Sequence, residues 1–218
     1  GTGWGGFAIH AAKHYGCHVT TTTISKEQLE LAQERVRSEG LEDRITLLFD
    51  DYRDLAGQFD KLVSIEMIEA VGKEYLPTFF QQCSNLLKKD GIMLLQAITI
   101  SDQRLNSYAK SVDFIQKHIF PGGFLPSQLL INQHLKKHTD MMIRDLHDIG
   151  LDYARTLQHW HQAFNDNIEA LAKDGYDERF GNMWRYYFSY CEGGFLERTI
   201  STVQLVLSKP AYNAQLSR

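Results

Sequence analysis

The sequence predicts an α/β fold in which a parallel sheet is covered by helices on both faces. Up to Ile100, stretches with helical spacing alternate with short β-branched or apolar stretches. Helix-capping residues such as Ser25 and Gly16 stand at the ends of the helical stretches. Strand–helix alternation at this pitch is typical of parallel sheets, because each crossover needs a helix to return the chain.

The elements of the first half follow from these patterns in order. Residues 6–15 have helical spacing and end at Gly16, a glycine suited to the left-handed turn after a helix. Residues 17–24 are β-branched and predict a strand. Residues 25–40 predict a helix, with Ser25 as N-cap and Gln28 three positions on. Further strands are expected at 44–49, 60–67 and 92–99, and a helix running into a turn at 74–91.

After Ile100 the regular alternation of predicted strands and helices ends. Residues 111–127 are aromatic, contain a Pro-Gly-Gly turn and look like an insertion over the sheet. We find no internal repeat or linker, so we expect a single domain over residues 1–218 with an insertion at roughly 101–140. Later elements are expected as a helix at 127–138, a strand at 141–150, mostly helix at 153–195 and a closing strand at 201–209.

Composition narrows the class of protein. The 218 residues carry a formal net charge of -4, so no global basic field draws the chain to nucleic acid. The three cysteines are odd in number and far apart, which argues against a disulfide framework or zinc site and fits a reducing cytoplasm. His134 and His138 stand four apart without an acidic or third ligand nearby, and we expect no metal there. The sequence contains no apolar stretch of membrane-spanning length.

The chain begins with GTGWGG, directly before the first predicted helix. A glycine-rich turn at a helix N-terminus brings backbone N–H groups close to a ligand. By itself the pattern fits several nucleotide-binding folds and also plain turns. Such a turn normally follows a buried strand, and none precedes Gly1. We therefore expect that an N-terminal strand is missing and that the chain is the C-terminal part of a longer protein.

Several segments then occur in a fixed order: GTGWGG, TTTISKEQLELAQERV, DDYRDL, FDKLVSIEMIEAVG, LLKKDGIMLLQAIT and IFPGGFLPS. In this combination the chain resembles the cyclopropane fatty acid synthase family, or mycolic acid cyclopropane synthases, among the class I S-adenosylmethionine (SAM) methyltransferases. The resemblance covers nearly the whole chain. It implies a Rossmann-like class I methyltransferase sheet with a helical insertion, SAM as cofactor and a bound bicarbonate ion. It also implies unsaturated phospholipid acyl chains as partners, a cytoplasmic protein peripheral at the inner membrane surface, and room for a homodimer.

The resemblance assigns SAM to three places. The glycine loop holds the methionine and sulfonium part, and a threonine and a glutamine replace the acidic residue that binds the ribose in the wider fold. An aspartate or its neighbour accepts a hydrogen bond from the adenine, and a tyrosine stacks on the ring. From the residues alone, Gln28 fits equally well as half of a capping box with Ser25. The acidic turn around Asp51 is likewise explained as a solvated loop. The assigned residues are Gly1, Gly3, Thr23, Gln28, Asp51 and Tyr52.

The resemblance also implies a polar cluster around bicarbonate. It assigns Glu69 and Tyr153 to the ion, with a main-chain contact from Ile98. Without the family, Glu69 is equally well explained as an acid at a helix start, and Tyr153 as a half-buried tyrosine at a helix start. Ring-forming members have a histidine where this chain has Gln96, which cannot carry a proton. Glu66 stands nearby, and we rank it below Glu69.

The expected function is SAM-dependent C-methylation of the double bond of unsaturated acyl chains in phospholipids. The product is a cyclopropane or, because Gln96 departs from the pattern, a methylene- or methyl-branched fatty acid. Cys191 matches a family cysteine near the acyl pocket, although a small buried residue is the plainer interpretation. The alternatives are a catalytically silent lipid-binding protein with the SAM fold and a small-molecule methyltransferase. A large apolar cavity beside Glu69 favours lipid, and a small polar one excludes it.

Overall fold

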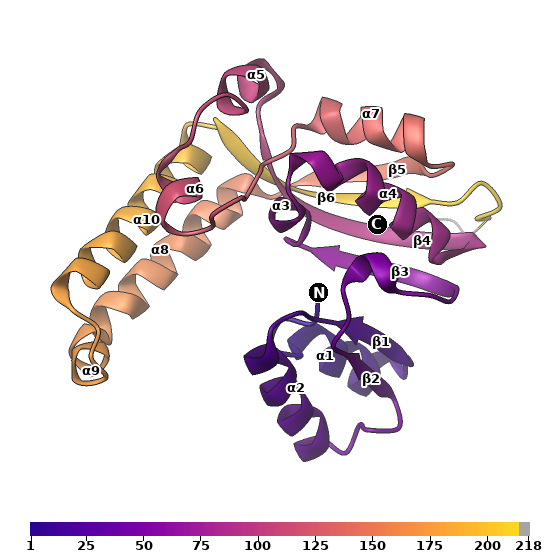
Figure 1. The fold of residues 1–218 in the computed structure, drawn as a ribbon, viewed down its shortest axis with the longest axis horizontal. Coiled ribbons are helices and arrows are strands. Elements are labelled where there is room, and N and C mark those ends of the chain that lie inside the picture. Colours follow the sequence, from indigo (N-terminus) through magenta and orange to yellow (C-terminus); the bar gives the residue numbers. More distant parts are fainter. Residues whose placement is uncertain (214–218) are drawn as a thin grey trace. The chain divides into compact units, whose positions relative to one another are not determined.

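The structure, a computed structural model, describes residues 1–213. The chain forms two compact units, Gly1–Phe59 and Asp60–Arg218 (Figure 1). The expectation of a single domain therefore stays a prediction.

The first unit contains a small parallel sheet with two helices. Its two strands pair from Val19 opposite Ile45 to Thr22 opposite Leu48. Ser25 caps the second helix by accepting a hydrogen bond from the backbone N–H of Gln28, as the sequence predicts. The elements are α1 (Gly6–Tyr15), β1 (Val19–Thr22), α2 (Lys26–Ser38), β2 (Ile45–Leu48) and a 3-10 turn, η1 (Tyr52–Asp54).

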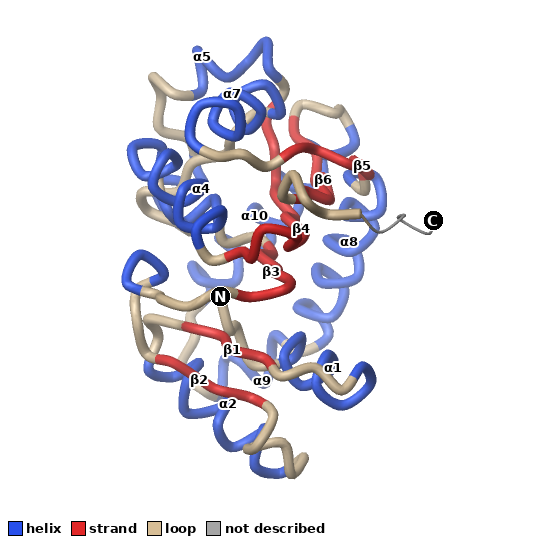
Figure 2. Tube along the Cα trace, turned by 90° about the vertical axis from the view of Figure 1, so that its right-hand side faces the viewer, coloured by secondary structure: helices blue, strands red, loops and turns tan. Residues whose placement is uncertain are grey.

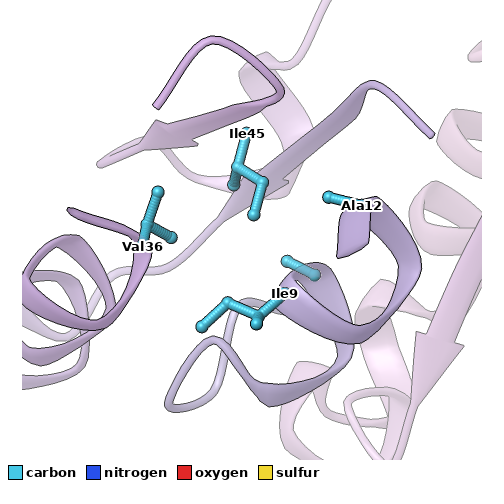
Figure 3. Close-up of a cluster of buried hydrophobic side chains, with 5 residues drawn as sticks. Ile9, Ala12, Val36 and Ile45 are labelled. Atoms are coloured by element: carbon cyan, nitrogen blue, oxygen red, sulfur yellow. The ribbon is translucent and has the colours of Figure 1, made fainter. Parts of the chain in front are cut away.

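The core of this unit is small and aliphatic. Ile9 and Ala12 on α1 face Val36 on α2 and Ile45 on β2 (Figure 3). The spacing of the buried positions on α1 is that of one helix face, which is why the helical prediction for this stretch is correct. Burial of this cluster therefore holds the two helices against the two strands.

The second unit is built on a four-stranded sheet in the order β3-β4-β6-β5. β6 runs antiparallel to both of its neighbours, so the sheet is mixed rather than purely parallel. β4 ends at Ile100 opposite Ile200, where β6 begins, and the chain must run back along its partner. β4 also begins earlier than expected, because residues 87–91 are part of the strand and not a turn. The strands are β3 (Phe59–Ile65), β4 (Leu87–Ile100), β5 (Met142–Asp148) and β6 (Ile200–Ser208).

Helices cover both sides of this sheet. Figure 2 shows α4 and α7 on one side and α8 on the other. Part of the predicted insertion at 101–140 is helical, and that boundary stays a prediction. The helices are α3 (Ile68–Val71), α4 (Leu76–Asn85), α5 (Leu105–Tyr108), α6 (Phe114–His118), α7 (Gln128–His138), α8 (Gly150–Asp166), α9 (Ile168–Lys173) and α10 (Glu178–Leu196), with 3-10 turns η2 (Lys73–Tyr75) and η3 (Asp102–Arg104).

The two long helices α8 and α10 form a hairpin packed on β6 (Figure 1). Their shared core consists of Ala154 and Leu157 on α8 with Phe188 and Phe195 on α10. Gly150, at the start of α8, lies so close to Ser201 of β6 that a side chain there would collide with it. This close approach brings the first turn of α8 to the sheet. Within residues 1–213, no helix is both long and apolar enough to span a bilayer.

Candidate active site

The site begins where β3 ends. Glu66 directly follows the strand and has a φ of 50°, in the left-handed region that residues other than glycine rarely adopt. Its backbone N–H donates to the carbonyl of Gln96 on the adjacent strand at 2.9 Å, which holds this turn in place. The chain then enters α3, and Glu69 lies in the first turn of that helix.

Glu69 is a largely buried carboxyl with one oxygen bound. Its Oε1 accepts the backbone N–H of Ile98 at 2.5 Å. Among residues 1–213, none supplies a hydrogen-bond partner to its Oε2, which is buried. Burial raises the pKa of Glu69 to about 7, and the charge of Glu66 adds a smaller contribution in the same direction. Glu69 therefore exchanges its proton near neutral pH.

Glu66 receives two hydrogen bonds from different elements. The hydroxyl of Tyr153, in the first turn of α8, donates to its Oε2 at 2.7 Å. The side-chain amide of Gln96, on β4, donates to its Oε1 at 2.7 Å. Burial, followed by the negative charge of Glu66, raises the pKa of Tyr153 well above its usual value. The phenol therefore keeps its proton and acts as a donor.

Gln96 is itself oriented by a cross-strand partner. Gln204 lies opposite it on β6, and the side-chain amide of Gln204 donates to Gln96 Oε1 at 2.8 Å. With its carbonyl oxygen occupied, Gln96 turns its NH₂ group toward Glu66. The hydrogen bonds thus run in one direction, from Gln204 through Gln96 to the carboxylate.

The predicted catalytic residues fall into two pairs. Glu69 is bound to Ile98, and Tyr153 and Gln96 are both bound to Glu66. Glu66, which was ranked below Glu69 from the sequence, is the partner of both Tyr153 and Gln96. Gln204 was not expected at the site, although a glutamine within the apolar stretch of β6 was a usable signal.

A cavity of about 1300 Å³ opens beside these carboxyls, within the second unit. Both Glu66 and Glu69 line it, together with Tyr153. Most of the remaining wall is apolar or aromatic, so the cavity is large and apolar rather than small and polar. The aliphatic and aromatic lining residues are Ala70, Ile98, Ile100, Tyr108, Ile115, Ile119, Phe120, Phe124, Leu125, Leu157, Trp160, Trp184, Tyr187, Phe188, Tyr190, Phe195 and Ile200.

Cys191 belongs to this cavity wall. It is partly buried on α10, and burial raises the pKa of its thiol to about 12. Burial also raises the pKa of the neighbouring Tyr187 well above its usual value. Both groups stay neutral at physiological pH, so Cys191 acts here as a small apolar wall residue.

The glycine loop of the first unit makes a tight turn. Gly3 and Gly5 have φ values of 52° and 82°, and the N–H of Gly5 donates to the carbonyl of Thr2 at 3.0 Å. A side chain at Gly5 would come within 3.2 Å of the Cβ of Ala32, whereas Gly3 has open space around it. Gly1 is exposed at the start of this loop.

Thr23 and Gln28, both assigned to the ribose, are hydrogen-bonded to each other. The hydroxyl of Thr23 donates to Gln28 Oε1 at 2.9 Å. The backbone N–H of Ser25 also donates to Thr23, at 3.1 Å, so the side chain of Gln28 does not complete a capping box with Ser25. The structure thus gives this glutamine an orientation that helix capping does not explain.

Asp51 is engaged by a neighbouring arginine. It accepts three hydrogen bonds from Arg53, one from the backbone at 2.9 Å and two from the guanidinium at 2.8 and 2.7 Å. These bonds lower the pKa of Asp51 to about 2. Tyr52, which follows it, begins the turn η1 and is partly buried. Asp51 is therefore a fixed anion in this loop.

Solved structures share the fold described above. The mycolic acid cyclopropane synthase CmaA1, crystallised with SAH and CTAB, matches with a TM-score of 0.88 and 26% identity over 96% of this chain and 76% of that chain. The cyclopropane synthase MmaA2 from Mycobacterium tuberculosis matches with a TM-score of 0.87 and 24% identity, over 96% of this chain and 76% of that one. The fold is that of the Rossmann-like methyltransferases, as the sequence predicted.

The sequence profile of the mycolic acid cyclopropane synthetase family matches residues 1–205, and the chain belongs to this family. It is 42% identical to the cyclopropane-fatty-acyl-phospholipid synthase of Escherichia coli, over 98% of this chain and 53% of that protein. It is 40% identical to the tuberculostearic acid methyltransferase UfaA1 of Mycobacterium tuberculosis, over 95% of this chain and 48% of that protein. The chain thus spans about half the length of the curated relatives it matches.

Proposed function

We propose that the protein methylates a double-bond carbon of an unsaturated fatty acyl chain in a phospholipid, with SAM as methyl donor. The product is a cyclopropane or a methylene-branched fatty acid, and a methyl branch would require a later reduction of the methylene group. The observation that carries this proposal is the large, mostly apolar cavity with two carboxyl groups in its wall. The names of the relatives, a fatty-acyl-phospholipid synthase and a tuberculostearic acid methyltransferase, support the same substrate class.

The chemistry requires a dry site and a base. SAM, when bound, supplies an electrophilic methyl group, and an alkene is a neutral and weak nucleophile. Aromatic side chains such as Trp184, Tyr187 and Phe188 exclude water from the cavity and tolerate a positive charge on the acyl chain. A carbocation beside the new methyl group must lose a proton to give a stable product. The two carboxyls of the cavity are the candidate acceptors.

SAM fits the glycine loop and the residues around it. Gly3 has a left-handed backbone and no atom within 4 Å of where a side chain would be, so the backbone can approach a ligand there. Thr23 and Gln28 present a hydroxyl and an amide suited to ribose hydroxyls. Tyr52 offers a ring for the adenine, and Asp51 an acceptor for its amino group. The crystal structure of CmaA1 with SAH supports this assignment.

Bicarbonate does not fit the same residues well. The donors near the expected ion already serve carboxylates of the protein: Tyr153 and Gln96 donate to Glu66, and the N–H of Ile98 donates to Glu69. An added anion would have to displace a carboxylate and would meet its negative charge. We therefore derive no step through bicarbonate.

A phospholipid substrate also implies that the protein acts at a membrane surface. We propose a peripheral association with the inner surface of the membrane, tested by flotation with vesicles of unsaturated phospholipid. A homodimer and a cytoplasmic location stay predictions, and sedimentation analysis of the natural gene product tests the first of these.

The direct test uses the natural gene product that carries this sequence. It is incubated with methyl-labelled SAM and with vesicles of either unsaturated or saturated phospholipid. Label is expected only in the unsaturated lipid. SAM binding without transfer to lipid would favour the catalytically silent alternative, and label in soluble compounds the small-molecule alternative. Proton NMR of the extracted fatty acids then distinguishes a ring from a methylene branch, since the two products have equal mass.

A further inference from the structure

We propose that the Glu66 carboxylate is the base that removes the proton from the methylated acyl chain, so that no bicarbonate ion is needed. This inference rests on the proposed function, which supplies the carbocation. It starts from the hydrogen bonds of Glu66, which is in the cavity wall and accepts from Tyr153 and from Gln96. Tyr153 is one of the residues that the family resemblance assigned to bicarbonate, and Gln96 stands where the ring-forming members have a histidine.

The surroundings of Glu66 match an ionised carboxylate. Each oxygen accepts one hydrogen bond at 2.7 Å, and both donors are neutral groups. Donation to an ionised oxygen is stronger than donation to a neutral one. Gln204 fixes the direction of the Gln96 amide, because its own donation occupies the Gln96 oxygen. These two donations stabilise the ionised form of Glu66, which is the form that can accept a proton.

The backbone conformation of Glu66 also supports a role for its side chain in the cavity. A left-handed conformation is strained for residues other than glycine. Glycine would adopt the observed φ of 50° without this strain, yet a glutamate stands there. The turn puts its carboxylate in the cavity wall, between a donor from α8 and a donor from β4. A catalytic role of the carboxylate in the cavity explains why the strained backbone is tolerated.

The step balances without any further reactant. When the methyl group has been transferred, the acyl chain carries a carbocation beside it. A C–H bond of that chain then breaks, and its proton passes to an oxygen of Glu66. The electron pair of that bond closes the ring as a new C–C bond, or forms the double bond of a methylene branch. Glu66 returns the proton to water when the product leaves.

Glu69 is less suited to this role. Its Oε1 is bound to the N–H of Ile98, and burial raises its pKa to about 7, so that the protonated form is present at neutral pH. In that form Glu69 is a neutral neighbour that lets Glu66 keep its charge. The two carboxyls thus have different roles: Glu66 accepts the proton, and Glu69 is a positioning residue.

The first experiment measures label transfer to unsaturated phospholipid with bicarbonate either removed by degassing or added back. The wild-type rate is expected to be the same in both conditions. Glu66→Gln keeps the size of the side chain and is expected to lower the rate by about 100-fold or more, since it cannot accept the proton. Glu74→Gln, an exposed acid outside the site, is the matched control and is expected to leave the rate unchanged.

Glu66→Gly distinguishes a base from a residue that only maintains the structure, because added bicarbonate could replace a missing base but not a missing structural contact. Glycine suits the φ at this position, so the variant is expected to fold. It empties the space between Tyr153 and Gln96, and added bicarbonate is expected to restore part of its activity. A wild-type rate that falls when bicarbonate is removed would overturn the proposal, as would full activity in Glu66→Gln.

A binding measurement separates this inference from the proposed function. Line broadening of ¹³C-bicarbonate in NMR is expected with Glu66→Gly and not with the wild-type protein. Bicarbonate bound to the wild-type protein and released by Glu66→Gly would refute the role of Glu66 whether or not lipid is methylated. Absence of label in lipid from the wild-type protein under every condition would instead refute the proposed function.

Discussion

Glu66 and Glu69 stand one helical turn apart in the sequence, yet their carboxyl groups meet different surroundings. Glu66 has a hydrogen-bond donor for each oxygen, whereas Glu69 has one for Oε1 only. Donors stabilise the charged form of a carboxyl, and burial without a donor stabilises the neutral form. The pair therefore consists of one carboxyl with a donor on each oxygen and one carboxyl that titrates near neutrality.

The raised pKa of Glu69 predicts a pH-dependent stability. The folded protein holds a proton on Glu69 up to about pH 7, whereas the unfolded chain releases it near 4.5. Because the folded state binds more protons in this window, the free energy of unfolding falls as pH rises from 4.5 to 7. The loss attributable to Glu69 is on the order of 3 kcal/mol, from the size of the shift.

Glu69→Gln tests this prediction, because its side-chain oxygen can still accept from Ile98 while it carries no charge. Thermal unfolding of both proteins is followed across the pH range. The difference between them is expected to grow in favour of the variant as pH rises from about 4.5 to 7 and to level off above 7. Parallel curves for the two proteins would contradict the assignment of the raised pKa to Glu69.

At the scale of single elements, the glycine loop determines how α1 begins and how it packs. Gly5 precedes α1 with a left-handed backbone, and its close approach to Ala32 lets α1 pack against α2. Gly6, the first residue of α1, has no such constraint and open space around it. The two neighbouring glycines therefore serve different purposes.

Gly5→Ala is expected to lower the free energy of unfolding by about 1–2 kcal/mol, because the new side chain is strained by the backbone. It also meets the Cβ of Ala32 at 3.2 Å. Gly6→Ala is the matched control and is expected to be neutral or stabilising by up to about 1 kcal/mol, since alanine favours the helix. Denaturant unfolding followed by circular dichroism measures both changes. Equal effects of the two substitutions would show that the left-handed turn has no energetic role.

At the scale of the second unit as a whole, the cavity is a product of several elements. The helices α8 and α10 supply much of its aromatic wall, and the polar cluster comes from β4 and the residues after β3. Gly193 on α10 lines this cavity, and no atom lies within 4 Å of where its side chain would begin. The absence of a side chain there keeps part of the cavity open.

Gly193→Leu is expected to fill that space and to lower transfer to long acyl chains by about 10-fold or more, because even one methylene group that an apolar pocket cannot accept changes binding by about 1–3 kcal/mol. Shorter unsaturated chains are expected to be affected less. Gly193→Ala, which adds a single methyl group, serves as control. The measurement is label transfer to phospholipids that differ in acyl chain length. An unchanged preference would mean that the acyl chain does not occupy this part of the cavity.

Much of the fold was predictable because its determinants are local. The caps at Ser25 and Gly16 and the periodicity of residues 6–15 and 201–209 act within a few positions of the chain. The predicted helices and strands correspond to those of the structure, apart from the early start of β4. The antiparallel direction of β6 was not predictable in this way, because it depends on where a long helical hairpin returns the chain.

The sequence by itself determined most of the elements, the family, and the site residues Glu69, Gln96, Ile98 and Tyr153. Only the tertiary structure decided which of those residues touch. Tyr153 binds a carboxylate 87 positions away, and Gln96 binds one 30 positions before it and an amide 108 positions after it. The choice of Glu66 over Glu69 as their partner depends on a backbone turn and on strand pairing. Those contacts are set by packing between distant segments, which no local pattern encodes.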